Sequence, residues 1–474
     1  MSGAAPITPP TIKESLTFYN ALVKQQSYYR SGATLPIDFR ISQLKKLRKA
    51  IEENETLIME ALSADLRKPA FEAFGTEIGI LYAELDEHLK NLKSWSKPTT
   101  VRTGFFHFKA YSKIYNDPRG AVLIIAPWNY PFHLALLPLI GAISAGNVAA
   151  IKPSELAPAV SGVIAKIIGT LFSPEYISVW EGGVDTATGL LQQKWDLIFF
   201  TGSTSVGQKV YEAAAKNLTP VVLELGGKSP CIVHSDAQLE NAAKRIAWGK
   251  VVNAGQTCVA PDYLYIHESV KEPFLERLRQ CFTDMLGEIP ENSPDYARII
   301  NEQHFDRLLS LMKNGTLYSG GISDRTTRYI SPTILTDMKE EYDIMREEIF
   351  GPLLPVITYT DIKEVIGYIN AHPKPLALYI FTTSDKIADK VIHYTSSGGG
   401  CVNDVMWHLG NKHLPLGGVG DSGMGVYHGR SSFDAFSHKK SFLHRSASVD
   451  LPLRYPPYNK VSLPTLKKLF KYFG

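Results

Sequence analysis

The stretch that decides the fold is Leu197-Ile198-Phe199-Phe200-Thr201-Gly202-Ser203-Thr204-Ser205-Val206-Gly207. It opens with the apolar run 197–200, a pattern that predicts a buried strand, and a glycine turn follows. Residues 205–216 are typical of a helix, and residues 220–225 form a second apolar run. Strand, turn, helix and strand in this order predict a parallel sheet with helices on both of its faces.

The same alternation extends from this stretch in both directions. Short apolar runs alternate with helical patterns from about Arg119, and the alternation resumes after Glu224. The further expected strands lie at 121–126, 147–151, 177–180, 229–233 and 262–266, and the further expected helices at 134–145, 158–172, 239–251 and 270–286. We therefore expect an α/β fold with two doubly wound parallel-sheet domains and a ligand site between them.

Two parts of the chain stand outside this alternation. Residues 11–95 carry apolar side chains at near-helical spacing between charges, which predicts helices. Residues 106–116 carry spaced aromatic side chains that indicate a hairpin strand, and residues 431–442 are expected to pair with it. The two segments would form a small β extension used in oligomerisation.

Composition narrows the class of protein. The chain has 474 residues, 44% hydrophobic and 20% charged, which is ordinary for a globular enzyme of two or three domains. A net charge of +3 and the lack of a dense basic stretch argue against nucleic-acid binding. The cysteines and histidines show no metal-ligand spacing, so we expect reduced thiols and no metal site. Neither a signal peptide nor a membrane-spanning apolar stretch is visible, which favours a cytoplasmic protein.

Cys258 and Glu224 are the strongest candidates for chemistry. Cys258 follows the small and polar residues Asn253-Ala254-Gly255-Gln256-Thr257, where a substrate can approach closely. Glu224 ends an apolar strand just before a Gly-Gly pair, so its carboxylate would project into a cleft. A thiol and a carboxylate are the nucleophile and the general base of covalent acyl chemistry. Taken singly, a cysteine is more often a buried structural residue, and a glutamate a paired surface charge.

Two turns complete the set. Asn129 lies in Pro127-Trp128-Asn129-Tyr130-Pro131, where the flanking prolines predict a turn that would hold its side-chain amide in place. The turn from Gly202 to Gly207 opens a helix, a context suited to pyrophosphate binding at a helix N-terminus. It is not the usual GxGxxG pattern, and by itself it would indicate only a helix N-cap.

In this order, the turn with Asn129, the glycine turn, Glu224 and Cys258 resemble the NAD(P)-dependent aldehyde dehydrogenase superfamily, over about residues 35–460. The resemblance implies that the Cys258 thiolate attacks an aldehyde. The Asn129 amide and the Cys258 backbone N–H would stabilise the oxyanion. Hydride transfer to NAD(P) would leave a thioester, which water activated by Glu224 would hydrolyse.

The resemblance also implies cofactor contacts, at Trp128, Lys152, Glu155, Gly202, Ser203, Gly207, Glu348 and Phe350. Lys152 and Glu155 would contact the adenosine ribose, and Glu348 would hold the nicotinamide ribose. A carboxylate at Glu155 would repel a 2′-phosphate, which favours NAD over NADP, although relatives accept both. The expected substrate-tunnel residues are Tyr130, Leu134, Trp248 and Trp407, with Met406 near the mouth.

Residues 414–425, 427–429 and 454–458 look like the class 3, or fatty aldehyde dehydrogenase, branch. That branch implies a homodimer and a hydrophobic substrate, whether a medium-chain, long-chain, aromatic or apocarotenal-like aldehyde. The expected domains are 1–105 with 119–225 for NAD(P) binding, 226–418 for catalysis, 106–118 with 419–446 as oligomerisation strands, and 447–474 as a tail with an amphipathic helix.

Three alternatives stay open. The tail pattern of Leu466, Leu469, Phe470 and Phe473 between lysines is that of a short basic amphipathic helix. Such a helix could lie on an anionic membrane, or dock on its own protein and cap the tunnel. The chain could pass its acyl group to coenzyme A, although the presence of Glu224 favours hydrolysis. It could also be an enzyme-derived binding protein, against which the intact set of site residues argues.

Overall fold

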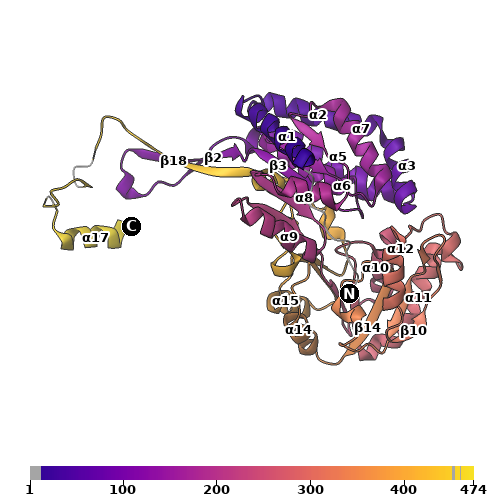
Figure 1. Ribbon diagram of the computed structural model, residues 1–474. Coiled ribbons are helices and arrows are strands. Elements are labelled where there is room, and N and C mark those ends of the chain that lie inside the picture. Colours follow the sequence, from indigo (N-terminus) through magenta and orange to yellow (C-terminus); the bar gives the residue numbers. More distant parts are fainter. Residues whose placement is uncertain (1–11, 451–453, 460, 474) are drawn as a thin grey trace.

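The computed structural model describes residues 12–450, 454–459 and 461–473. Two α/β units lie one above the other, and a narrow arm that contains β2 and β18 projects from the upper unit (Figure 1). The two units are built on separate sheets, and the arm on a third. The predicted fold class, two parallel-sheet units with a small β extension, is confirmed.

The sheet of the upper unit has the strand order β17-β7-β6-β3-β4-β5. Its strands are β3 (Ala121–Ile125), β4 (Val148–Lys152), β5 (Ile177–Val179), β6 (Leu197–Thr201), β7 (Val221–Glu224) and β17 (Gly423–Met424). Only β17 is antiparallel to its neighbour. The accompanying helices are α6 (His133–Ala145), α7 (Pro158–Leu171), α8 (Val184–Leu191) and α9 (Thr204–Ala215). Helix α8 is not predicted by the sequence pattern, because its eight residues are too few for a clear helical repeat.

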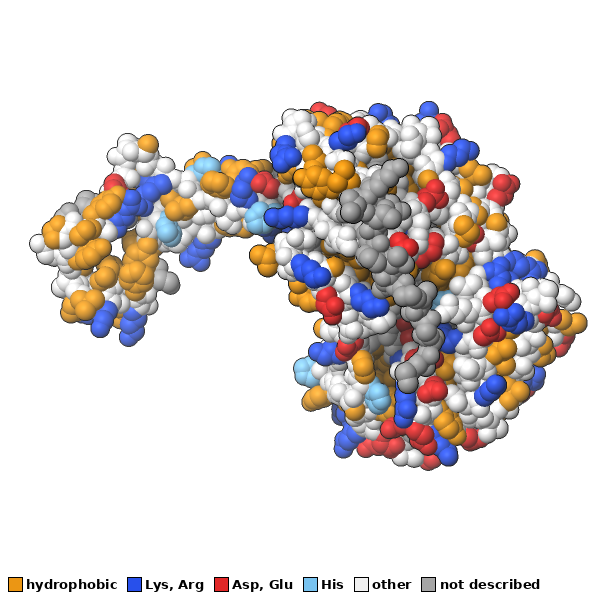
Figure 2. Space-filling view, in the orientation of Figure 1, with side chains coloured by type: hydrophobic (Ala, Val, Ile, Leu, Met, Phe, Trp, Pro, Cys, Tyr) orange, Lys and Arg blue, Asp and Glu red, His pale blue; other side chains and the backbone are white. Residues whose placement is uncertain are grey.

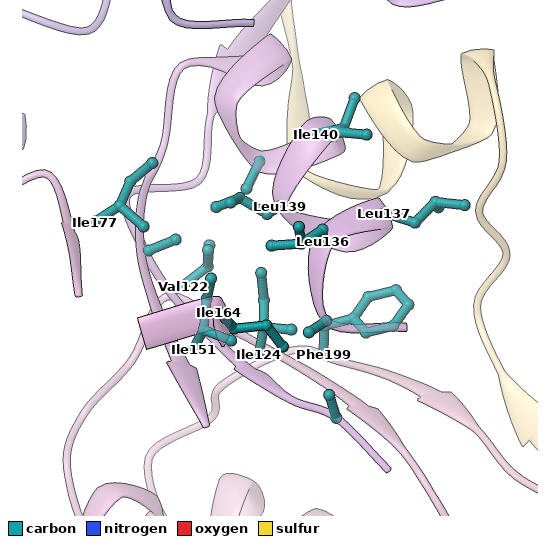
Figure 3. Packing of buried hydrophobic residues seen from close by; sticks show 14 of the residues in the cluster. Val122, Ile124, Leu136, Leu137, Leu139, Ile140, Ile151, Ile164, Ile177 and Phe199 are labelled. Atoms are coloured by element: carbon teal, nitrogen blue, oxygen red, sulfur yellow. The ribbon is translucent and has the colours of Figure 1, made fainter. Parts of the chain in front are cut away.

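Helix α6 is the centre of the upper core. Every residue of this helix is buried, in keeping with a sequence that is apolar on all sides. Leu136 and Leu139 of α6 lie beside Val122 and Ile124 of β3 (Figure 3). The turn that precedes α6 carries Asn129, so this packed helix gives the turn a rigid support.

The N-terminal helices cover the upper unit. They are α1 (Ile12–Arg30), α2 (Ile37–Glu53), α3 (Glu55–Leu66), α4 (Ala70–Ala73), the π-helical turn η1 (Phe74–Ile78) and α5 (Gly79–Trp95). Gln25 of α1 donates a hydrogen bond to the Ala149 carbonyl of β4 at 2.8 Å, which ties the first helix to the sheet. The predicted helical character of residues 11–95 agrees with these helices from residue 12 onward; residue 11 lies outside the described chain.

The sheet of the lower unit has the order β10-β13-β14-β9-β8-β15-β16, parallel except at β10. Its strands are β8 (Pro230–Val233), β9 (Tyr263–His267), β10 (Thr316–Ser319), β13 (Thr333–Thr336), β14 (Leu353–Tyr359), β15 (Ala377–Phe381) and β16 (Gly399–Val402), with a separate hairpin of β11 (Ser323–Asp324) and β12 (Tyr329–Ile330). The helices are α10 (Leu239–Val251), α11 (Lys271–Leu286), α12 (Glu302–Leu311), α13 (Asp343–Arg346), α14 (Ile362–Ala371) and α15 (Asp385–Tyr394).

The arm is a three-stranded antiparallel sheet of β1 (Thr99–Val101), β2 (Ala110–Pro118) and β18 (Ser437–Arg445). The predicted strand 106–116 is wrong at its start, because residues 105–107 form a 3-10 turn and Lys109 has a left-handed φ of 55°. The predicted strand 431–442 is also wrong at its start. Residues 430–435 form helix α16 (Arg430–Ala435), and Phe436 packs so closely on Gly141 of α6 that no side chain would fit there.

The chain ends in helix α17 (Leu463–Phe473) at the tip of the arm (Figure 1). The predicted tail helix is confirmed at this position. Apolar and basic side chains both gather on the tip (Figure 2). No helix within the described residues is long and apolar enough to cross a membrane. The domain bounds given above stay a prediction, although β17 and α16 pack with the upper unit rather than with the arm.

Candidate active site

A cleft of about 560 Å³ lies between the two sheets. One wall is formed by the carboxyl ends of β6 and β7 and by the start of α9, and the other by the loop that carries Cys258 and by residues 345–350. Ligands of parallel sheets bind at the carboxyl ends of the strands. The predicted site residues that line this cleft are Trp128, Asn129, Leu134, Gly202, Ser203, Glu224, Cys258, Glu348 and Phe350.

The loop before Cys258 has an unusual backbone. Asn253, Ala254 and Gly255 all have left-handed φ angles, of 52°, 50° and 72°. For a non-glycine residue this conformation costs about 1 kcal/mol, so contacts beyond the loop's own backbone must hold it. The Gln256 side chain supplies several of them, because its amide donates to the carbonyls of Asn253 and Arg298, at 2.9 Å each.

Cys258 itself is partly buried at the floor of the cleft. Burial raises the pKa of its thiol to about 12, and the nearby carboxyl groups of Glu348 and Glu224 add to that rise. The thiol is therefore protonated at neutral pH in the absence of a partner that removes the proton. A base within the cleft is needed to form the nucleophilic thiolate.

Glu224 and Glu348 each hold a buried carboxylate oxygen that has no hydrogen-bond partner among the described residues. Burial raises the pKa of Glu224 well above its usual value. Burial, together with the charge of Asp262, raises the pKa of Glu348 to about 8. A buried polar atom without a partner costs about 1–3 kcal/mol, so these oxygens point to a bound ligand or water as their partner.

The Asn129 turn is held from both units. The side-chain amide of Asn129 donates to the Gln256 carbonyl at 3.1 Å. In return, the side chain of Asn253 donates to the Asn129 carbonyl at 2.9 Å. This reciprocal pair places an amide group directly beside the loop of the thiol, with one of its two N–H groups left for another acceptor.

The upper wall of the cleft fits a dinucleotide. Helix α9 begins at Thr204 without a side-chain cap among the described residues, so its first N–H groups are available to an anion. The rings of Trp128 and Phe350, 5.2 Å apart, offer an apolar contact for a flat ring. Glu348 lies so close to Gly226 that any larger residue there would collide with the carboxylate. The first N–H groups of α9 would bind a pyrophosphate, and the rings of Trp128 and Phe350 would contact a flat ring. The Glu348 carboxylate would accept a hydrogen bond from a ribose hydroxyl.

Several predicted residues lie outside the cleft lining. Lys152 and Glu155 form an ion pair at the end of β4. Gly207 has no free space, since a side chain there would meet Leu225, so its glycine is explained by packing of α9 on the strand end. The remaining residues are Tyr130, whose hydroxyl bonds Thr257 Oγ1 at 2.7 Å, and Trp248 and Trp407, whose rings stack with centroids 6.1 Å apart. The roles predicted for these residues stay predictions.

Several further residues at or near the site are not apparent from the sequence. Lys68 is fully buried beneath the Asn129 turn, yet nothing in Arg67-Lys68-Pro69 distinguishes it from a surface lysine. His304 lines the cleft with its ring 5.0 Å from Trp128. Arg307 and Lys228 line it as well. Outside the cleft, Cys401 is only partly buried, and its sulfur lies 3.4 Å from His408 Nδ1.

The chain belongs to the aldehyde dehydrogenase family, which matches residues 17–442. It is 47% identical over 448 residues to the 4,4'-diaponeurosporen-aldehyde dehydrogenase of Staphylococcus aureus, with 94% of this chain and 97% of that protein covered. A structure described as the substrate-bound state of Staphylococcus aureus AldH has a TM-score of 0.93 and 46% identity, and covers 95% of this chain and 99% of that one. The predicted activity class, aldehyde dehydrogenase, is confirmed.

Two mammalian relatives indicate which branch of the aldehyde dehydrogenase family this chain is similar to. The mouse aldehyde dehydrogenase family 3 member A2 is 43% identical over 451 residues, covering 95% of this chain and 93% of that protein. The dimeric NADP-preferring aldehyde dehydrogenase of Canis lupus familiaris is 44% identical over 436 residues, covering 92% and 96%. The predicted class 3 branch and the predicted cofactor class, NAD or NADP, agree with these relatives.

Proposed function

We propose that this chain oxidises a hydrophobic aldehyde to the carboxylic acid with NAD(P), through a thioester on Cys258 that water hydrolyses. The observation that carries the proposal is one cleft in which Cys258, Glu224 and Asn129 meet a wall suited to a dinucleotide. Nucleophile, base and oxyanion donor are the three parts that acyl chemistry of this kind requires.

Cys258 supplies the nucleophile. Glu224 accepts the thiol proton, the sulfur forms a bond to the aldehyde carbon, and the electrons of the C=O bond move to oxygen. The second N–H of the Asn129 amide and the backbone N–H of Cys258 donate to this oxyanion. One such donor is typically worth ~3 kcal/mol of transition-state stabilisation. Trp128, Phe350 and Glu348 would hold NAD(P), which would supply the acceptor for the hydride, so that a thioester on Cys258 would remain.

Glu224 then acts a second time. Once its proton has passed to solvent, its carboxylate takes a proton from water, and the hydroxyl oxygen adds to the thioester carbon. The C–S bond breaks, the carboxylic acid leaves, and the Cys258 thiolate is restored. The unpartnered buried oxygen of Glu224 supports this role, because a base needs a free lone pair in the cleft.

The preference between NAD and NADP follows from Glu155. Its carboxylate pairs with Lys152 at the end of β4, where the family resemblance puts the adenosine ribose. A 2′-phosphate would face this carboxylate, so we propose that NAD is preferred. The ratio of kcat/KM for NAD to that for NADP should fall in Glu155→Gln, and an unchanged ratio would contradict the assignment.

The substrate class rests on the relative from Staphylococcus aureus, whose name gives a long conjugated aldehyde. The test is steady-state NADH formation from acetaldehyde, decanal, hexadecanal and a conjugated polyene aldehyde, with NAD and NADP in parallel. We expect kcat/KM to rise steeply with chain length. A flat profile, or one that favours short aldehydes, would contradict the hydrophobic substrate and leave the activity class intact.

Transfer of the acyl group to coenzyme A is the rival outcome. Glu224 argues against it, because a base that activates water would compete with a thiol acceptor. Turnover should therefore be independent of added coenzyme A, and the product should be the free acid. A coenzyme A requirement would replace hydrolysis with acyl transfer.

We also propose a homodimer. β18 and β16 are each the last strand of their sheet, so each presents one edge without a partner strand within the described chain. Open edges of this kind readily accept a strand from a second copy. Sedimentation equilibrium should give twice the chain mass of 52.6 kDa, and a single-chain mass would refute the dimer.

A separate proposal concerns the membrane. On α17, Leu463, Leu466 and Phe470 are exposed beside the lysines of the helix. Phe470 also stacks on Phe106 of the arm, with centroids 4.3 Å apart, so docking on the arm competes with lipid contact. Full-length protein should sediment with anionic liposomes, and a form that ends at Val461 should not. If both stay in the supernatant, α17 is a packing element.

A further inference from the structure

Three ionisable side chains, Lys68, Glu72 and Glu77, lie beneath the Asn129 turn, outside the cleft lining. Lys68 and Glu77 are completely buried, and their Nζ and Oε1 atoms lie 2.6 Å apart. Glu72 is close enough for the Lys68 charge to act on its carboxyl. A buried ion pair seldom adds net stability, because the loss of hydration offsets the attraction. The cluster therefore calls for an explanation other than stability.

The ion pair grips the turn on the side of the upper unit. Lys68 Nζ donates to the Asn129 carbonyl at 3.2 Å and lies 4.2 Å from the centre of the Tyr130 ring. Glu77 Oε2 accepts from the backbone N–H groups of Phe132 and His133, at 3.0 Å each. The pair thus fixes both the residue that carries the amide and the first turn of the buried helix α6.

Glu72 contacts the loop before Cys258, which belongs to the lower unit. Its Oε1 accepts from the Asn253 backbone N–H at 2.9 Å, at the first of the three left-handed residues. The Asn253 side chain in turn donates to the Asn129 carbonyl, the same oxygen that receives Lys68. The Asn129 carbonyl therefore links the two halves of the site. Lys68 of the cluster donates to this carbonyl, and Glu72 of the cluster binds Asn253, the second donor to it.

We infer that Lys68, Glu72 and Glu77 are positioning residues that set the distance between the Asn129 amide and the Cys258 sulfur. The inference rests on the proposed function, which makes Asn129 an oxyanion donor. Hydrogen bonds to an oxyanion act only at the right distance, and a displacement of about 1 Å can cost ~100-fold in rate. The cluster acts through Asn129 and Asn253, since none of its members lines the cleft.

The first test is the double variant Lys68→Met/Glu77→Gln. It removes both charges, so neither is left buried without its partner. We expect kcat to fall by roughly 10–100-fold while KM for the aldehyde stays within about threefold. The matched control is Lys49→Met/Glu53→Gln, which makes the same two changes in an exposed ion pair of α2 and should leave kcat unchanged.

Glu72 provides a variant that leaves the buried pair intact. Glu72→Gln keeps an oxygen that can accept from Asn253, whereas Glu72→Leu removes the acceptor. We expect Glu72→Gln to retain most of kcat and Glu72→Leu to lose roughly tenfold or more. Equal kcat values in the two variants would contradict a positioning role for Glu72.

The deciding comparison adds Asn129→Ala. Once the amide is gone, misplacing the turn has no further cost, so the double variant should change kcat by less than about threefold in that background. Losses that multiply would show that the ion pair acts elsewhere and would overturn the inference alone. Full kcat in Asn129→Ala would overturn the oxyanion role of the proposed function, and the inference with it.

Discussion

At the scale of single residues, the site combines a thiol and a carboxyl group whose charged forms are both disfavoured by burial. Burial raises the pKa of Cys258 and the pKa of Glu224, and each negative charge would further disfavour the other. The Glu224 carboxyl group must therefore lose its own proton to solvent before it can accept the proton of the Cys258 thiol.

Glu224→Gln should impair both chemical steps in which the proposal uses Glu224. Without the carboxylate the thioester cannot be hydrolysed efficiently, so steady-state turnover should fall by ~100-fold or more. Alkylation of Cys258 by iodoacetamide should slow as well, because glutamine cannot accept the thiol proton. Stopped-flow absorbance measures NADH formation in the first turnover. Alkylation at the parent rate together with a burst of one NADH per site would place Glu224 in hydrolysis only.

The pH dependence has a definite sign. A raised pKa means that the reactive thiolate and carboxylate forms gain population as the pH rises. Alkylation of Cys258 should therefore still be increasing between pH 8 and 10, where an ordinary thiol near pKa 8.5 approaches its plateau. The measurement is the alkylation rate against pH in the NAD-free enzyme. A plateau below pH 8 would contradict the effect of burial on this thiol.

At the scale of elements, the Glu84 side chain links its helix α5 to Gly429 and Ser432, at the start of α16. Its carboxylate accepts from the Gly429 backbone N–H at 2.8 Å, from Ser432 Oγ at 2.9 Å and from His88 Nε2 at 3.0 Å. Burial opposes its ionisation, but the hydrogen bond and charge of His88 outweigh burial and lower the pKa to about 2. The folded state therefore stabilises the charged form of the Glu84 carboxylate.

Glu84→Gln should lower the free energy of unfolding by about 3 kcal/mol at pH 7, the equivalent of the depressed pKa. Because the folded-state pKa is depressed, this stabilisation is present above the unfolded pKa near 4.5 and is lost as the pH falls toward 2. Urea unfolding midpoints of the two proteins should therefore converge below about pH 4.5. Glu53→Gln, at an exposed position on α2, is the control and should match the parent at every pH.

The elements themselves were largely predictable, and the exceptions have physical causes. Strands such as β3 and β6 are continuous apolar runs bounded by turns, so their sequences alone predict them. Residues 430–435 are helical because Phe433 and Phe436 are buried against α5 and α6, a contact that local sequence does not encode. Lys68 is hidden for the same reason, since only the tertiary fold distinguishes a buried lysine from a surface one.

At the scale of the molecule, the arm has little core of its own. Phe442 and Leu443 of β18 are half exposed, and β2 is the one strand that pairs with β18 within the described residues. Half-exposed apolar side chains on an open strand edge favour burial against another chain. The dimer proposed above would cover them.

Phe442→Asp/Leu443→Asp should shift the protein from dimer to monomer. Charges at a buried strand edge are costly in the dimer and cost little in a solvated arm. Sedimentation equilibrium measures the change, and the circular dichroism spectrum should stay the same. Leu218→Asp/Ile289→Asp makes equal changes at two exposed positions of the body and should leave the dimer intact. Monomer formation by the control pair would point to general destabilisation.

The contacts that hold the left-handed loop before Cys258 also bear on when the site can form during protein synthesis. The loop is fixed by Glu72 and Asn129, synthesised long before it, and by the backbone of Arg298 and Ile300, synthesised after it. A chain whose synthesis stops before Arg298 would carry Cys258 and Glu224, the proposed nucleophile and base, without the backbone contacts that Arg298 and Ile300 make with Gln256. We therefore expect the proposed catalytic centre to form late in synthesis, although the cysteine lies near the middle of the chain.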